Sequence, residues 1–263
     1  MENGKPVNDS CTLRLSEGFY DFHIGNNEYH YQSKKSENKV LYHNGNKNVA
    51  CALTAIKELF SQTPEALAIV GQSAGGHRCV AHCPQIHELY PDCNNVVVYS
   101  EVSYLRSSLW IEIAKNVWKV SSNLMEYIKS EDLISDLFHY AKDNMPSSTK
   151  FLHFNSVWDK ENTKFMYKMN HGKLSVNQQA LQEYHNMLTI AVGKLKKEIP
   201  NYFYYLTDYG KSPKDQTTPH VFSDSQKLIH SKMQDGMSLA NWLMQAIDNK
   251  PVDVGSKFVK SIK

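Results

Sequence analysis

Short apolar runs alternate with stretches of helical periodicity along most of this sequence, and that alternation constrains the fold more than any other feature. Four runs have the length and composition of buried strands, at residues 66–70, 95–100, 151–156 and 202–206. Apolar residues at helical spacing fill the intervals between them. Strands that alternate with helices are typical of βαβ units, so the sequence predicts an α/β fold with a mostly parallel sheet flanked by helices.

The same periodicity places the expected helices. They cover residues 48–60, residues 74–89 and a region over 107–141 that we interpret as two helices broken near Ser130. Ser175 and Gln178 match a capping box for a long helix that ends near Lys197, and a last helix is expected over 238–247. We expect a single domain over residues 1–263, with residues 1–17 and 251–263 as loosely ordered ends.

Composition narrows the functional classes. The chain carries 29 Lys and Arg against 27 Asp and Glu, a net charge of +2, and 41% of its residues are hydrophobic. A nucleic-acid-binding face usually gives a basic excess, so nucleic acid is not the expected partner. No apolar run reaches the roughly 18 residues of a membrane span. The first residues lack the pattern of a secretory signal, so the sequence as written predicts a cytoplasmic protein.

One short motif indicates a catalytic function. Gly71-Gln-Ser-Ala-Gly-Gly76 lies between the expected strand at 66–70 and the expected helix at 74–89. Gly-x-Ser-x-Gly in a strand–turn–helix context is a nucleophile elbow, in which Gly71 and Gly75 allow close approach of the backbone. We predict Ser73 as the nucleophile and the Ala74 amide as a donor to an oxyanion. In the alternative interpretation, Ser73 only caps the helix.

A nucleophilic serine needs a base and an acid that orients the base, and in such folds these follow the serine in the order acid, then histidine. His220 follows the aromatic strand at 202–206 and is the preferred base, with His230 as the second candidate. Asp159 follows the strand at 151–156 and is the preferred acid, because α/β sites gather at the carboxyl ends of strands. The competing carboxylates, Asp208 and Asp215, and the helical histidines, His77 and His82, are less favoured.

The five cysteines give no strong indication of a metal site or a disulfide framework. Cys79 and Cys83 are four residues apart on an expected helix, near His82 and His87. A metal site there is the less favoured interpretation, because helical cysteines usually pack in the core. We therefore predict no metal.

The elbow, Val70-Gly-Gln-Ser-Ala-Gly-Gly76, followed by Cys83-Pro-Gln-Ile and Leu89-Tyr-Pro91, resembles the pectinacetylesterase/Notum family of serine hydrolases. The similarity spans about residues 18 to 250. Further matching segments are Asp21-Phe-His-Ile-Gly-Asn26, Asn44-Gly-Asn-Lys-Asn-Val49, Asp159-Lys-Glu-Asn-Thr-Lys-Phe-Met-Tyr167, Pro219-His220 and Asp235-Gly-Met-Ser-Leu-Ala-Asn-Trp242.

The resemblance implies an α/β-hydrolase-like fold and a catalytic triad of Ser73, Asp159 and His220. It also implies hydrolysis of a small-molecule or carbohydrate ester through an acyl-serine, without a metal or organic cofactor. The family has an earlier strand that ends in a Gly-Gly-Gly loop, and no Gly-Gly pair precedes Asp21. We therefore expect a shortened member or a fragment with impaired activity, acting outside the cell if its N-terminus is truncated. A catalytically silent binding homologue is the alternative.

Overall fold

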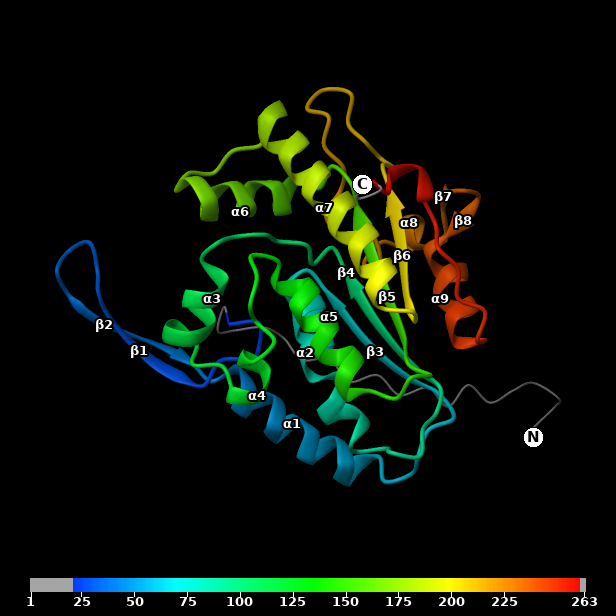
Figure 1. The fold of residues 1–263 in the computed structure, drawn as a ribbon, viewed down its shortest axis with the longest axis horizontal. Helices are drawn as coiled ribbons and strands as arrows, with labels where there is room; N and C mark the ends of the chain where they lie inside the picture. The colour runs from blue at the N-terminus through cyan, green and yellow to red at the C-terminus, as the bar shows by residue number, and fades with distance from the viewer. Residues whose placement is uncertain (1–20, 261–263) are drawn as a thin grey trace.

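A four-stranded parallel sheet forms the centre of the molecule (Figure 1). The computed structural model describes residues 21–260. The strands are β3 (Leu67–Gln72), β4 (Val96–Glu101), β5 (Lys150–Ser156) and β6 (Tyr202–Thr207), hydrogen-bonded in the order β3-β4-β5-β6. Each matches an expected strand within two residues, so the predicted α/β class is confirmed.

Helices cover both faces of the sheet (Figure 1). On one face, α2 (Ala74–His87), α5 (Leu133–Asn144) and α7 (Gln178–Glu198) enclose the larger part of the core. On the other face, α9 (Leu239–Ile247) packs its buried Trp242 against Tyr99 and Tyr205. Successive strand residues point to opposite faces, and both sets are apolar because both faces are covered.

The remaining elements surround this centre. The antiparallel hairpin β1 (Asn27–Gln32) and β2 (Asn38–His43) projects from the body, and α1 (Gly45–Leu59) follows it (Figure 1). The others are α3 (Trp110–Glu112), a π-helical turn at Ile113–Val117, α4 (Ser122–Met125), α6 (Lys160–His171), α8 (Gln226–His230), β7 (Lys232–Gln234), β8 (Met237–Ser238) and a 3₁₀ turn at Ser256–Phe258. Within residues 21–260, no helix is both long and apolar enough to cross a membrane.

Several local expectations were wrong. The strand expected to be buried on both faces, β3, is the sheet edge, and Val70 is 59% exposed. The region 107–141 forms three short helical segments before α5 rather than two helices. The side chain that caps α7 is that of Asn177, which accepts from the Ala180 amide at 2.8 Å, rather than that of Ser175.

The described part of the expected loose end at residues 251–263 makes backbone hydrogen bonds to β6. The sequence predicted a loose end from residue 251, but the Val254 amide donates to the Tyr204 carbonyl at 2.9 Å and the Leu206 amide donates to the Val254 carbonyl at 3.0 Å. Val254 is buried and forms one parallel bridge with Tyr205, so this segment extends the sheet beyond β6 by a single bridge. Residues 261–263 and the other expected loose end, residues 1–17, lie outside the described residues.

Candidate active site

Ser73 stands at a sharp turn between β3 and α2. Its φ of 52° and ψ of −120° are unusual for a residue with a side chain, and such strain is common at functional sites. The turn is held by two backbone hydrogen bonds, from the Ser73 amide to the Glu101 carbonyl at 2.7 Å and from the Gly76 amide to the Ser73 carbonyl at 2.9 Å. The expected strand–turn–helix context of the elbow is confirmed.

At two of the three elbow glycines there is no room for a Cβ atom. A Cβ at Gly71 would lie 1.9 Å from the Gly75 carbonyl oxygen, and a Cβ at Gly76 would lie 2.7 Å from Ser100 Oγ. A Cβ at Gly75 would meet only the flexible Arg78 guanidinium, at 3.3 Å. The sequence indicated close backbone approach at Gly71 and Gly75, and the Gly75 carbonyl does lie against Gly71. The crowding of Gly76 by the side chains of Ser100 and Ser103 was not expected.

Asp159 is the N-cap of α6, directly after the loop that leaves β5. One carboxylate oxygen, Oδ1, accepts the Asn162 amide at 2.8 Å, which satisfies one of the free amides of the helix. The other oxygen remains available to a second partner. Asp159 is fully buried.

His220 lies on the loop after β6, and this loop runs beside the end of β5. The Thr218 amide donates to the Trp158 carbonyl at 2.9 Å, so that Thr218 forms a parallel bridge with Asp159. Ser156 Oγ donates to the Pro219 carbonyl at 2.9 Å. These bonds place the His220 side chain between Asp159 and the elbow.

The three side chains form a continuous chain of hydrogen bonds. His220 Nδ1 lies 2.7 Å from Asp159 Oδ2, and His220 Nε2 lies 2.8 Å from Ser73 Oγ. With Nδ1–H donating to the carboxylate, Nε2 is the acceptor for the serine hydroxyl. The His220 side chain is 21% exposed and that of Asp159 is not exposed. An external molecule can therefore reach the serine–histidine end, while the carboxylate stays shielded.

Electrostatics favour a charged histidine in this arrangement. Burial lowers the pKa of His220, but the hydrogen bond and charge of Asp159, with smaller contributions from Glu161 and Glu101, outweigh it and raise the pKa. Burial raises the pKa of Asp159, against the opposing effects of His220 and the helix amides. A group that takes a proton from serine is stabilised when it becomes positive, as a general base requires.

Ala74 is the first residue of α2, beside Ser73. The first amides of a helix have no intrahelical acceptor, and they lie at the positive end of the helix dipole. Its N–H can therefore donate to negative charge that develops next to Ser73.

The competing candidates lie elsewhere or have other contacts. His230 is exposed at the end of α8, and Asp215 is exposed and bound to Lys160 and Thr217. The carbonyl of Asp208 accepts the Lys211 amide in a turn. His77 stacks on Phe22 in the core.

The side chain of His82 is also in the core, where it contacts Gln85 and the His23 carbonyl. Cys79 and Cys83 are buried free thiols that contact backbone carbonyls. Among residues 21–260 no cluster of three or more metal-ligating side chains is found.

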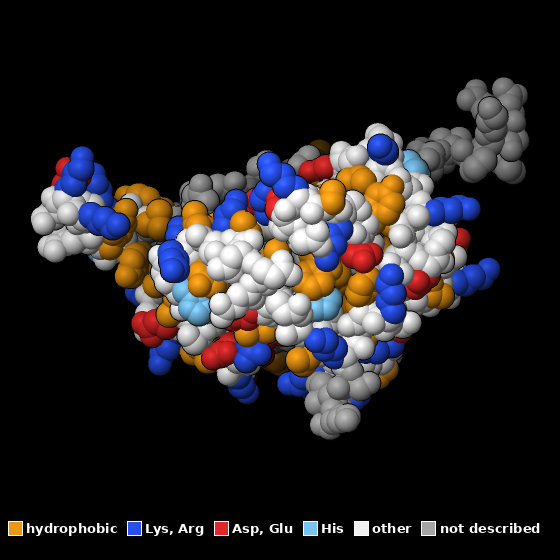
Figure 2. Space-filling model, turned by 90° about the horizontal axis from the view of Figure 1, so that it is seen from above, with side chains coloured by type: hydrophobic (Ala, Val, Ile, Leu, Met, Phe, Trp, Pro, Cys, Tyr) orange, Lys and Arg blue, Asp and Glu red, His pale blue; other side chains and the backbone are white. Residues whose placement is uncertain are grey.

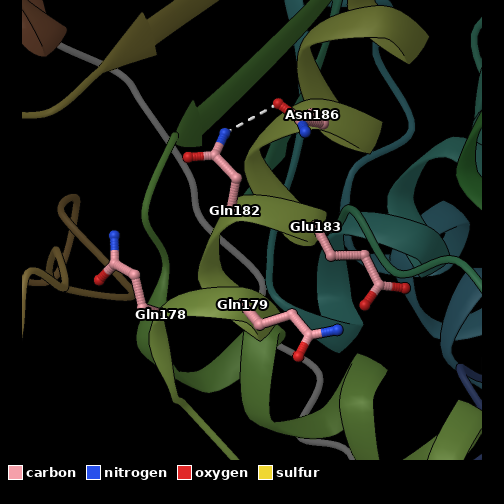
Figure 3. A pocket seen from close by; sticks show the side chains of 5 residues that line it. All are labelled: Gln178, Gln179, Gln182, Glu183 and Asn186. Carbon is pink, nitrogen blue, oxygen red and sulfur yellow. Dashed lines mark hydrogen bonds between the residues drawn. The ribbon is translucent and has the colours of Figure 1, made fainter.

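One face of the molecule has a mixed surface. Figure 2 shows hydrophobic, polar and charged side chains intermingled on the side toward which the strands run. One open hollow lies on α7 and is lined by Gln178, Gln179, Gln182, Glu183 and Asn186 (Figure 3). None of the residues around Ser73 lines it, so it is separate from the candidate active site.

Solved structures resemble the molecule, although comparisons of its whole sequence find no match. No protein-family model and no curated protein sequence matches the chain. Two structures of the Wnt deacylase Notum from Drosophila do match. Crystal form II is 12% identical with a TM-score of 0.58 and aligns over 90% of this chain and 68% of that chain. This chain has the α/β-hydrolase-like fold of Notum. Crystal form I is 13% identical with a TM-score of 0.56 and aligns over 88% of this chain and 65% of Notum's. At this identity the likeness is one of fold.

Proposed function

We propose that the protein is a serine-dependent carboxylic-ester hydrolase. Ser73 Oγ attacks the ester carbonyl while His220 Nε2 takes the hydroxyl proton, and the Ala74 amide donates to the oxyanion. The tetrahedral intermediate expels the alcohol, which receives that proton from His220. Water activated by the same nitrogen then releases the acid from the acyl-serine. Asp159 orients the imidazole and stabilises its charged form.

The observation that carries this proposal is the unbroken hydrogen-bond chain from Asp159 through His220 to a serine in a strained elbow. A helix-capping serine alone would not require a histidine with a buried carboxylate behind it. The side chain of Ser73 makes no cap hydrogen bond to α2, which also disfavours the capping interpretation. The structural neighbour Notum is a Wnt deacylase, and removal of an acyl group is a reaction of the same class.

The proposal is tested by labelling with a fluorophosphonate probe and by turnover of p-nitrophenyl acetate. Ser73→Ala removes the nucleophile, so we expect loss of labelling and a fall in turnover of several orders of magnitude. The control is Ser61→Ala, at an exposed serine outside the site, which leaves both unchanged. Full activity in Ser73→Ala would refute the assignment.

A second experiment tests whether the three residues act together. His220→Ala and Asp159→Asn should each reduce turnover strongly, and their combination with Ser73→Ala should reduce it little further. Losses that multiply in the triple variant would show that the residues act independently.

For the substrate, we propose an acetylated carbohydrate. Release of acetate from acetylated oligosaccharides, compared with hydrolysis of p-nitrophenyl octanoate, distinguishes this class from long-chain acyl esters. Preference for the octanoate ester would overturn the substrate class and leave the reaction type intact.

A silent binding homologue remains the second candidate because of one sequence feature. The chain contains no Gly-Gly-Gly segment, so Ala74 is the oxyanion donor that the elbow itself identifies. Loss of one such donor costs about 10²–10³ in kcat. We expect slow but specific labelling of Ser73 together with poor turnover of acetyl esters. Rapid turnover would show that another group completes the oxyanion hole.

A further inference from the structure

Glu101, the last residue of β4, contacts both the nucleophile turn and the histidine loop. Its backbone carbonyl accepts the Ser73 amide at 2.7 Å. Its carboxylate points to the opposite segment, where Oε1 accepts the Phe222 amide at 2.6 Å and the Ser223 amide at 3.1 Å. Oε2 accepts the Ser223 hydroxyl. One residue thus joins the two segments that carry the nucleophile and the expected base.

These contacts hold the histidine loop from its far side. On the near side of His220, Pro219 is bound to Ser156 at the end of β5, and Thr218 is bound to Trp158 just after it. On the far side, the two amides that Glu101 accepts belong to the second and third residues after His220. The imidazole is therefore carried by a short segment with fixed points before and after it.

The segment that carries Asp159 is also bonded to the turn at the end of β4. Directly after Glu101, Val102 has a φ of 47°, which a β-branched residue rarely adopts. Its amide donates to the Phe154 carbonyl at 2.7 Å, and its carbonyl accepts Asn162 Nδ2 at 2.8 Å. Asn162 is the residue whose amide is capped by Asp159. The strained turn after Glu101 is therefore hydrogen-bonded to α6, the helix that Asp159 caps.

A carboxylate at this position is costly. Glu101 is 0% exposed, and burial raises its pKa against the opposing effect of the hydrogen bonds from Ser223 and Phe222. The neighbouring Phe222 already anchors the loop by packing its ring 5.0 Å from that of Phe154. An apolar residue would fill the space at lower cost, but it could not accept the two loop amides.

We propose that Glu101 is a positioning residue, whose carboxylate fixes the 222–223 backbone and so holds His220 in line with Ser73. It acts through the loop and does not contact the reacting atoms. This inference rests on the proposed function for its kinetic consequence, while its structural consequence can be measured without turnover.

Two substitutions separate the geometry of Glu101 from its charge. Glu101→Leu removes every acceptor, so we expect kcat for p-nitrophenyl acetate to fall about 10²-fold with KM nearly unchanged, as for a misplaced catalytic group. Glu101→Gln keeps an oxygen for the two amides, and its amide can donate to Ser223 Oγ. We expect kcat within tenfold of wild type for this variant.

The pH profile gives an independent readout. Three acidic groups raise the pKa of His220: Asp159 and Glu161 at the start of α6, and Glu101 from β4. Glu101→Gln removes one negative charge, so the acid limb of kcat/KM should move to lower pH. The matched control is Glu161→Leu, which also removes a charge near His220 but makes no contact with the 222–223 backbone. It should shift the limb without a 10²-fold fall in kcat.

A measurement that does not depend on turnover is the downfield proton resonance of His220 Nδ1–H in its bond to Asp159. We expect it in wild type, Glu101→Gln and Glu161→Leu, and its loss in Glu101→Leu. If wild type neither labels nor turns over esters, but shows this resonance and Glu101→Leu loses it, the proposed function fails and the positioning role stands. Wild-type kcat and resonance in folded Glu101→Leu, or an effect on KM alone, would overturn the positioning role.

If Glu101→Leu does not fold, Ser223→Ala provides the test. A several-fold lower kcat at constant KM in this variant supports the positioning role, and an unchanged kcat overturns it.

Discussion

At the scale of single residues, the site depends on one buried carboxylate and one partly exposed imidazole. Asp159 is shielded from water and has two separate tasks, because Oδ1 caps α6 and Oδ2 binds His220. Asp159→Asn is therefore a more specific test than Asp159→Ala, since asparagine also caps helices well and alanine would cost about 1 kcal/mol of stability.

The raised pKa of His220 leads to a pH prediction. A general base must be neutral in the resting enzyme, so activity falls as the pH drops below this pKa. Because Asp159 raises the pKa above the ordinary histidine value of about 6.5, the acid limb of kcat/KM should have its midpoint above pH 6.5. In Asp159→Asn the residual activity, about 10⁴-fold lower, should show a midpoint at lower pH.

The measurement is kcat/KM for p-nitrophenyl acetate from about pH 5 to about pH 9, a range that brackets the pKa of histidine. Acetate release should be followed by titration as well, because the absorbance of p-nitrophenol itself depends on pH. A midpoint below pH 6.5 in the wild type would contradict the stabilised imidazolium.

At the scale of elements, the carboxyl ends of neighbouring parallel strands bring the site together. The residue after β3 is the serine, the loop after β5 leads to Asp159, and the loop after β6 carries His220. The register aligns Gln72 with Glu101 and Glu101 with Phe154, so these ends lie at one edge of the sheet. Ligands of α/β sheets commonly bind at this edge.

The tight turn between β3 and α2 predicts an unequal response of its glycines to alanine. Gly71→Ala should lower the free energy of unfolding by about 3 kcal/mol or more, because its Cβ would overlap backbone. Gly76→Ala should cost about 1–3 kcal/mol. Gly75→Ala should be neutral or stabilising by up to about 1 kcal/mol, because alanine favours the helix and Arg78 can move. Urea unfolding followed by tryptophan fluorescence measures all three, and Gly75→Ala as the most damaging change would contradict this geometry.

At the scale of the whole molecule, the large core contains histidines that must remain neutral. Burial lowers the pKa of His77 to about 3 against an opposing effect of the Ser73 backbone, and burial lowers the pKa of His153 to about 3 as well. His153 contacts Tyr202 and Ser103, whereas the ring nitrogens of His77 have no hydrogen-bond partner among the described residues.

Because these histidines are buried in the neutral form, we expect the protein to lose stability in mild acid. Their folded pKa lies below the unfolded value of about 6.5, so the unfolded chain binds more protons between pH 6.5 and 3, and stability falls as pH falls through this window. Each contributes a loss of about 1.4 kcal/mol per pH unit, or about 2 kcal/mol at pH 5.

The test compares unfolding free energies at pH 7 and pH 5 for His77→Phe and His230→Phe. Phenylalanine can keep the stacking on Phe22 and cannot be protonated, so His77→Phe should reduce the loss at pH 5 by about 2 kcal/mol. His230 is exposed, and its replacement should leave the pH dependence unchanged. Equal pH dependence in wild type and His77→Phe would contradict the buried neutral histidine.

Much of the framework followed from local patterns. Short apolar runs separated by helical periodicity predicted all four strands of the central sheet, because β-strands and helices are each specified by nearby residues. The elbow motif and the chain order of acid and histidine selected Ser73, Asp159 and His220, and the structure brings these three side chains together. Their catalytic roles stay predictions until the activity is measured.

Other features were decided only by tertiary structure. The exposure of Val70, the crowding at Gly76 and the packing of Val254 on β6 depend on which segments become neighbours. In the sequence, Glu101 is only the residue that follows the expected strand at 95–100. Its role as acceptor for the histidine loop arises from contacts across 121 and 122 positions of sequence, which no local pattern encodes. Local propensity determined the elements and the order of the reactive residues, and long-range packing determined which backbone groups hold them in place.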